Sequence, residues 1–286
     1  MVEATAPSKA WMLWKGARDL ARRYPDPMDA GLPGERLTLR DVTVNRSALR
    51  DYNAVCGFAD SERLPFTYPH ILGFKSQMAI MMDRAFPMPV TGMLHVSNEC
   101  RQYKAIGLAE HFDLEVWAEN LRPHHKGVVV DLRTEAHVAG EAVWSETSTY
   151  LRLMKRPGPR PPKENGEEDP VEGEVAEWFV PPRLGRDYAA VSGDYNPIHV
   201  SKAMSKAMGN KDVIAQGMWG LSRAAAELVP DGAADGMRVA VDFRRPIQLR
   251  QKIGFHSRDG DGPREFALVR LRDRKRYVRG TVSFDL

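Results

Sequence analysis

A carboxylate and an imidazole stand five positions apart at Asp194 and His199, within the segment GDYNPIH. Pro197 disfavours helical backbone at the residue before it, and Gly193 and Pro197 together bracket a turn. Such a turn can aim both side chains at one point. Histidine titrates near neutral pH, and a carboxylate can orient it or share a water molecule with it. The pair is therefore a candidate acid–base unit; the simpler alternative is a helix-capping Asp beside a surface His.

The residues around this pair extend the pattern in both directions. The chain reads YAAVSGDYNPIH from Tyr188 to His199, and VIAQGM from Val213 to Met218. These segments resemble the signature of the MaoC-like, or R-specific enoyl hydratase (hydratase 2), family, in which a Gly-Asp-x-Asn-Pro-x-His core precedes Ile-Ala-His-Gly-Met. The resemblance covers most of the second half of the chain. The first half resembles the degenerate partner domain of two-hotdog family members.

The resemblance implies an α+β fold of two tandem hotdog domains, each an antiparallel sheet wrapped around a central helix. It implies that Asp194 and His199 activate water for addition to a trans-2-enoyl thioester, or catalyse the reverse dehydration of the (R)-3-hydroxyacyl thioester. Gly217 would present its N–H to the thioester oxygen at the start of a helix, where the helix dipole favours negative charge. Asn196 and Gly193 would support the turn. The substrate would be a thioester of coenzyme A or of an acyl carrier protein.

Two residues depart from the family pattern. Gln216 replaces the usual histidine before the glycine; it can form hydrogen bonds but cannot titrate. Trp219 replaces a smaller apolar residue, and it could either reshape an acyl pocket or pack in the core. The Asp194 and His199 pair is intact.

The chain contains a long internal repeat. Tyr52–Phe58 (YNAVCGF) matches Tyr188–Asp194 (YAAVSGD) at an offset of 136, and Gly92–Val96 parallels Gly236–Ala240 at an offset of 144. Repeats this far apart indicate a duplicated domain rather than a solenoid. At the first offset, Asp194 and His199 correspond to residues of unrelated chemistry, Phe58 and Arg63. We therefore predict one active site per chain, in the second half.

A break in composition separates the two copies. Residues 155–174 carry five prolines and a run of acids, which favours an extended linker over a helix or strand. We predict a degenerate hotdog domain at 1–154, the linker at 155–174 and a catalytic domain at 175–286. The apolar segments 64–74 and 86–90 could line an acyl tunnel in the first domain, or simply belong to its core.

Helix-forming and alternating patterns predict the elements of each copy. We expect helices at 74–86, 181–191, 201–208 and 218–229, and strands at 112–119, 127–139, 142–154, 238–243, 266–272 and 277–286. Helices followed by strands are typical of an α+β protein with the helix packed on an antiparallel sheet.

Composition limits the class of protein. The 286 residues are 43% hydrophobic and 28% charged, with 41 basic and 38 acidic residues, which suits a globular protein and does not indicate nucleic-acid binding. No apolar run is long enough for a membrane span, and two cysteines weakly suggest a reducing compartment, so we expect a cytoplasmic protein. The basic excess lies near the C-terminus, at Arg270–Arg279, where an anionic coenzyme A or carrier protein could dock.

No cofactor or metal ion is expected. The chain has no Walker or dinucleotide-binding glycine pattern, and its histidines match no common metal-ligand spacing. Two other functions stay open: a hotdog acyl-CoA thioesterase, and a non-catalytic acyl-binding subunit of a heteromeric dehydratase. A monomer and a homodimer both suit two fused hotdogs.

Overall fold

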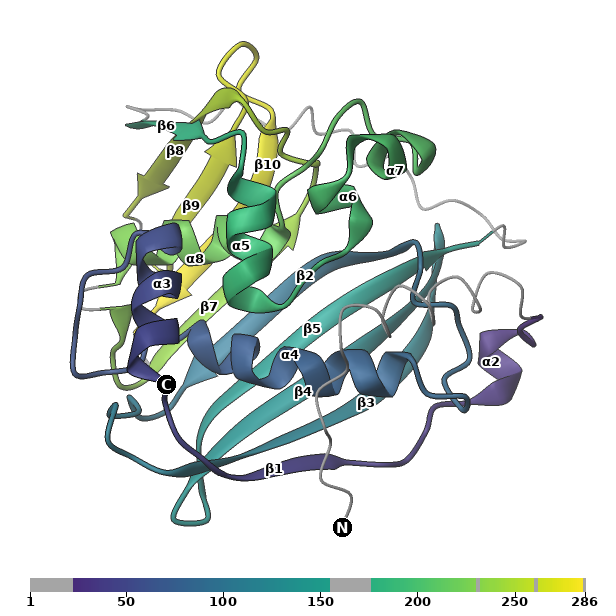
Figure 1. The fold of residues 1–286 in the computed structure, drawn as a ribbon, viewed down its shortest axis with the longest axis horizontal. Helices are drawn as coiled ribbons and strands as arrows, with labels where there is room; N and C mark the ends of the chain where they lie inside the picture. The colour runs from purple at the N-terminus through teal and green to yellow at the C-terminus, as the bar shows by residue number, and fades with distance from the viewer. Residues whose placement is uncertain (1–22, 155–175, 230–231, 260–261, 285–286) are drawn as a thin grey trace.

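A computed structural model describes residues 23–154, 176–229, 232–259 and 262–284. The described strands form one antiparallel sheet in the order β1-β3-β4-β5-β2-β7-β10-β9-β8-β6 (Figure 1). The strands are β1 (Leu37–Val42), β2 (Met93–Gln102), β3 (Phe112–His124), β4 (Gly127–Val138), β5 (Glu141–Leu153), β6 (Ala176–Val180), β7 (Met237–Phe243), β8 (Gln251–Arg258), β9 (Arg264–Val269) and β10 (Arg276–Ser283). The first five strands make one half of the sheet and the last five make the other.

The two halves are joined by backbone hydrogen bonding between β2 and β7. Six residue pairs line up along this junction, from Ser97 opposite Asp242 to Gln102 opposite Met237. The hydrophobic core also crosses the junction, since buried residues of both halves form one cluster. The two halves therefore share one sheet and one hydrophobic core, and they do not form separate domains joined only by a linker.

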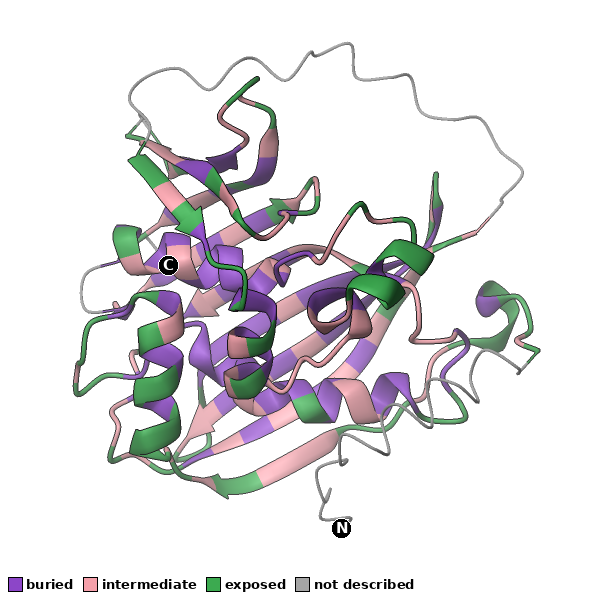
Figure 2. Ribbon diagram, turned by 45° about the horizontal axis from the view of Figure 1, so that its top comes forward, coloured by how far each residue is buried: buried purple, intermediate pink, exposed green. Residues whose placement is uncertain are grey.

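Helices cover one side of the sheet (Figure 1). They are α2 (Pro27–Ala30), α3 (Arg46–Cys56), α4 (Tyr68–Met81), α5 (Leu184–Ser192), α6 (Pro197–Val200), α7 (Lys202–Ala207) and α8 (Gly217–Leu228). The central helix of the first half is α4 and that of the second half is α8; both are largely buried, whereas α3 and α5 expose their outward residues (Figure 2). Each half is thus a hotdog, as the sequence predicts.

The prediction of a helix at 74–86 is wrong at both ends, because α4 runs from Tyr68 to Met81. Pro69 lies in the first turn of the helix, where a missing N–H costs nothing, so this proline starts the helix instead of preventing it. After Met81 the chain turns, and the Asp83 carboxylate accepts a hydrogen bond from the N–H of Ala85 at 2.7 Å.

The repeated sequence segments occupy equivalent places in the two hotdogs. Gly57 ends α3 with φ 83°, and Gly193 ends α5 with φ 79°. Glycine takes this left-handed conformation without the steric penalty of a side chain. Gly92 and Gly236 also have positive φ, and they directly precede β2 and β7. The linker predicted at 155–174 lies outside the described residues, and the domain boundaries stay a prediction.

The first hotdog contains a buried polar cluster, which we define as His70 and Gln77 of α4, Asn98 of β2 and Glu146 of β5. The Glu146 carboxylate accepts hydrogen bonds from the amides of Gln77 (3.0 Å) and Asn98 (2.5 Å), and lies 2.7 Å from Nδ1 of His70. All four side chains are almost inaccessible to solvent. Burial raises the pKa of Glu146, but His70 first, and then the hydrogen bond from Asn98, outweigh it and hold that pKa below its usual value.

A second histidine, His95 on β2, gives the stability of the fold a pH dependence. Burial, followed by the nearby His70, lowers the pKa of His95 to about 3. The unfolded chain binds a proton at this residue near pH 6.5 and the folded chain does not, so stability is full above that pH and declines below it. Between pH 7 and 5.5 we expect wild type to lose about 1 kcal/mol more than His95→Phe, measured by urea unfolding at both pH values. Equal losses would contradict the assignment.

Candidate active site

Asp194 follows the left-handed glycine that ends α5, and a tight local turn fixes its carboxylate. Oδ1 accepts the backbone N–H of Asn196 at 3.1 Å, while the Asp194 N–H donates to Oγ of Ser192 at 3.1 Å. The Asn196 side chain in turn accepts the N–H of Ile198 and caps α6. One carboxylate oxygen is thus used to hold the turn, and the other is left for a different partner.

His199 lies on α6 and faces that second oxygen. Nδ1 lies 2.9 Å from the carbonyl oxygen of Ile214, which can only accept, so Nδ1 carries a proton and donates it. Nε2 lies 3.7 Å from Oδ2 of Asp194. The imidazole is 9% exposed and the carboxylate 25% exposed, so the pair is reached from the Asp194 side. The structure therefore brings together the two residues that the sequence pairs, at a spacing that one water molecule can bridge.

The backbone of His199 is held against α5 by a glycine that the sequence analysis missed. A Cβ added at Gly185 would lie 1.9 Å from the carbonyl oxygen of His199. No side chain fits in that space, so α5 and α6 approach each other at this point only because residue 185 is glycine. The contact is between residues 14 positions apart, and only the folded backbone reveals it.

Gln216, which directly precedes α8, links the start of that helix to α5 and to the Asp194 turn. Its side-chain amide donates to the carbonyl oxygens of Gly185 (3.0 Å) and of Asp194 (3.2 Å), and the residue is 2% exposed. The departure from the family histidine therefore preserves a hydrogen-bond donor and gives it two acceptors. This structural role does not require a side chain that can gain or lose a proton.

Replacing Gln216 with Leu removes both hydrogen bonds at similar side-chain size. The buried carbonyl oxygen of Gly185 and the half-buried one of Asp194 would lose this donor, so we expect a loss of about 1–3 kcal/mol in the free energy of unfolding, with reduced turnover as the Asp194 turn loosens. Urea unfolding and kcat measured on the same preparation would check this. Unchanged stability together with unchanged kcat would show that these two hydrogen bonds contribute neither to folding nor to catalysis.

Gly217 is the first residue of α8 and follows Gln216 directly. N–H groups in the first turn of a helix lack partners within the helix and point outward with the positive end of the dipole. The bond from Gln216 to Asp194 keeps this helix start beside the Asp194 turn. A Cβ at Gly217 would lie 3.0 Å from the ring of Phe243, so a larger residue would press on that ring.

Trp219, for which two roles were open, packs in the core. It is 3% exposed, and its indole N–H donates to the carbonyl oxygen of Val55 on α3 at 3.2 Å. This contact joins the central helix of the second hotdog to the first hotdog. The tryptophan thus contributes to the interface between the halves.

In the described part of the first hotdog, the two positions that the repeat aligns with Asp194 and His199 carry Phe58 and Arg63. Phe58 is buried in the core, and Arg63 forms an isolated bridge with Gly107. The two segments that could line an acyl tunnel supply core residues, among them Phe66 and Phe86, which are fully buried.

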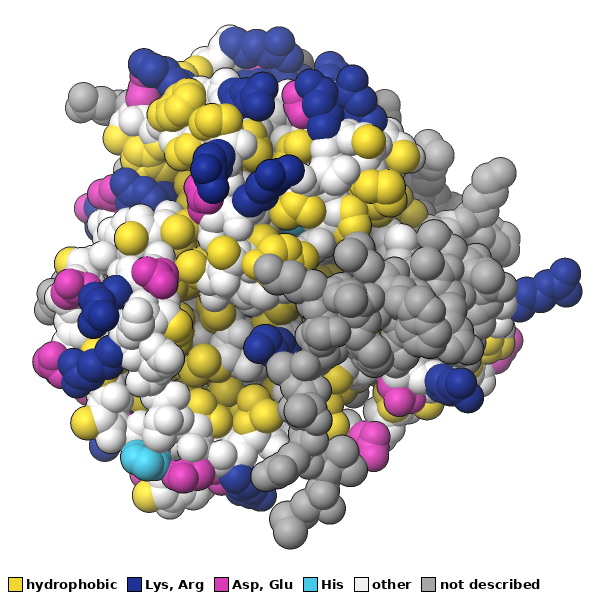
Figure 3. All heavy atoms as spheres, in the orientation of Figure 1, with side chains coloured by type: hydrophobic (Ala, Val, Ile, Leu, Met, Phe, Trp, Pro, Cys, Tyr) yellow, Lys and Arg dark blue, Asp and Glu magenta, His cyan; other side chains and the backbone are white. Residues whose placement is uncertain are grey.

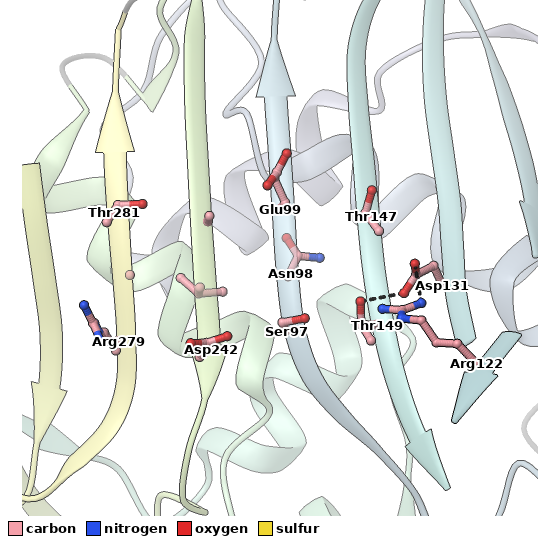
Figure 4. Close-up of a pocket in the computed structure, with 13 residues that line it drawn as sticks. Ser97, Asn98, Glu99, Arg122, Asp131, Thr147, Thr149, Asp242, Arg279 and Thr281 are labelled. Carbon is pink, nitrogen blue, oxygen red and sulfur yellow. Dashed lines mark hydrogen bonds and ion pairs between the residues drawn. The ribbon is translucent and has the colours of Figure 1, made fainter. Parts of the chain in front are cut away.

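A surface depression of about 580 Å³ lies away from Asp194 and His199. It is lined mainly by polar residues of β2, β3, β4, β5, β7 and β10, on the face of the sheet opposite the helices (Figure 4). Asp131 there accepts hydrogen bonds from Arg122 (2.8 Å) and Thr149 (2.7 Å). Within the described ranges, no cluster of His, Cys, Asp and Glu could hold a metal ion, and no helix is long and apolar enough to cross a membrane.

Comparison with known proteins identifies the family of this chain. The model of the MaoC-like domain matches residues 170–255. The chain is 31% identical to 3-hydroxyacyl-thioester dehydratase X of Mycobacterium tuberculosis over 261 residues, which is 90% of this chain and 91% of that protein. The crystal structure of HtdX from the same organism superimposes with a TM-score of 0.75 at 29% identity, covering 87% of this chain and 99% of the other. A MaoC-like dehydratase from Phytophthora capsici shares the fold, with a TM-score of 0.69 at 18% identity, covering 90% and 97%. The chain belongs to the MaoC-like dehydratase family.

Proposed function

We propose that this protein is an (R)-specific enoyl-thioester hydratase and (3R)-hydroxyacyl-thioester dehydratase, a hydro-lyase of fatty-acid metabolism. The observation that carries the proposal is the 3.7 Å spacing between Nε2 of His199 and Oδ2 of Asp194 in a partly open site. The similarity to 3-hydroxyacyl-thioester dehydratase X of M. tuberculosis supports the same chemistry.

The first step of hydration follows from the protonation state of the pair. Because Nδ1 of His199 donates to Ile214, Nε2 has a free lone pair directed toward Oδ2 of Asp194. A water molecule between these two acceptors has both hydrogens engaged and a lone pair available for the β-carbon of the enoyl group. As the C–O bond forms, one water proton passes to the pair, and a proton from the pair completes the reaction at the α-carbon. Dehydration follows the same path in reverse.

The second requirement is stabilisation of the charge that develops on the thioester oxygen. Attack at the β-carbon moves an electron pair onto that oxygen, and a fixed donor lowers the energy of this enolate. The N–H of Gly217 at the start of α8 is the proposed donor, since it adjoins the Asp194 turn and has no partner within the helix. The helix dipole adds to the effect.

Charged residues near the C-terminus suit an anionic carrier. The turn between β9 and β10 exposes Arg272 and Lys275, while Arg270 is paired with Asp273. Lys and Arg side chains gather at the top of the view in Figure 3, where the turn between β9 and β10 lies in Figure 1. Coenzyme A phosphates and acidic carrier proteins both favour such a surface, so both carriers belong in the test.

The test is loss of the conjugated-thioester absorbance of crotonyl-CoA on addition of the purified protein, repeated with longer enoyl-CoAs and with enoyl-carrier-protein. Chiral analysis of the product should give the (3R)-hydroxyacyl thioester. A thiol assay with saturated acyl-CoA serves as the control for hydrolysis. Thiol release without hydration would support a thioesterase instead, and binding without any turnover would support a non-catalytic subunit.

A further inference from the structure

A row of aromatic rings runs from the start of α8 into the first hotdog. Phe243, at the end of β7, lies against Gly217. The Phe243 ring centre is 4.9 Å from that of His95 on β2, and His95 lies 4.6 Å from Tyr150 on β5, with the two planes only 17° apart. The row therefore connects the proposed oxyanion donor in one hotdog with a tyrosine in the other.

Tyr150, at the far end of the row, is connected to Gly217 at the start of α8 through the rings of His95 and Phe243. Burial, then the charges of Glu146 and Asp194, raise the pKa of Tyr150 well above its usual value. The phenol is therefore protonated at any physiological pH and can donate a hydrogen bond. The Tyr150 side chain is 9% exposed, and its position opposite His95 in the β2–β5 ladder directs it to the helix-covered side.

The buried polar cluster contacts the row at His95, through the ring of His70. The His70 ring lies 6.4 Å from that of His95 at an angle of 17°, and Nδ1 of His70 is 2.7 Å from Glu146. His95 is thus stacked on His70 and Tyr150, and the Phe243 ring contacts it at a tilt of 57°. Its Nε2 atom is buried and has no hydrogen-bond partner among the described residues, so stacking rather than hydrogen bonding at this atom fixes the ring.

We propose that Tyr150, held by its stack on His95, extends the active site into the first hotdog and donates a hydrogen bond to the oxygen that leaves or joins the β-carbon. This inference rests on the proposed function and adds a specific residue to it. The phenol would lie on the far side of the reacting oxygen from Asp194 and His199. It would distinguish a 3-hydroxyacyl group from a saturated acyl group, because only the former offers that oxygen.

Tyr150→Phe removes the hydroxyl and keeps the ring on His95. We expect kcat with crotonyl-CoA to fall about 10- to 100-fold, with little change in KM. Tyr277→Phe is the matched control, since Tyr277 is also buried but donates to Gln251 within the second hotdog. His95→Phe should keep most activity because it keeps the stack, whereas His95→Ala should lose as much as Tyr150→Phe. Wild-type kcat in Tyr150→Phe would overturn the proposal.

A binding measurement separates this proposal from the function on which it rests. In the Asp194→Asn background, calorimetry would compare (3R)-hydroxybutyryl-CoA with butyryl-CoA. Adding Tyr150→Phe should weaken the hydroxylated ligand about 10-fold and leave the saturated ligand unchanged. Equal affinities before and after the change would refute a role for the phenol. If wild type binds with this preference but does not turn over, the proposed function fails and the recognition by Tyr150 stands.

Discussion

Asp194→Asn should lower kcat for hydration of crotonyl-CoA by about 10²- to 10⁴-fold, because the amide cannot accept a proton from water as the carboxylate can. The backbone N–H of Asn196 can still donate to the amide oxygen, so the turn should survive and thermal stability should stay close to wild type. Initial rates at saturating substrate, together with thermal unfolding of the same preparations, would measure both quantities.

The matched control is Asp187→Asn on α5, a surface carboxylate near Arg183 at 3.7 Å. It should turn over like wild type. His199→Ala should be impaired about as much as Asp194→Asn, and the double variant hardly more, because residues that act as a unit have non-additive effects. Additive losses would mean that Asp194 and His199 do not share one water molecule.

Gly185→Ala should disrupt the site without touching either proposed catalytic side chain. The new Cβ would lie 1.9 Å from the carbonyl oxygen of His199, so α5 and α6 must move apart. Overpacking of this kind costs about 1–3 kcal/mol, and the displaced imidazole should reduce kcat at least 10²-fold. Urea unfolding and steady-state kinetics would measure the two effects.

Gly262→Ala is the control for this variant. A Cβ at Gly262 meets nothing within 4 Å, and its φ is not in the left-handed range. The substitution should leave both stability and turnover unchanged. If Gly185→Ala behaved like Gly262→Ala, the close approach of the two helices would be unimportant for the position of His199.

The sequence predicts the parts of the site that are close together along the chain. Asp194 and His199 belong to one turn, whose glycine, asparagine and proline each have a local backbone preference. The duplication is also predictable, because the helix-ending glycines and the glycines before β2 and β7 recur in the same order. These features depend on near neighbours, for which residue type is informative.

Contacts between distant segments could not be predicted. Gln216 has no local signal for its bonds to Gly185 and Asp194, and nothing in the sequence places Tyr150 near the second hotdog. The strands at 93–102 and 251–258 were missed because their polar and apolar residues alternate weakly. Their conformation is set by pairing with neighbouring strands, which is a property of the whole sheet.

The pairing of β2 with β7 determines how long one edge of the first hotdog stays unpaired during synthesis. During synthesis β2 is finished at residue 102, but the strand that pairs with its outer edge, β7, ends at residue 243. Until then the first hotdog presents six residues of unpaired backbone donors and acceptors, which is a template for pairing with any other chain. In the newly made chain this edge can pair with the same edge of another copy until β7 docks on it, so the order of synthesis leaves a route to aggregation that the finished fold closes.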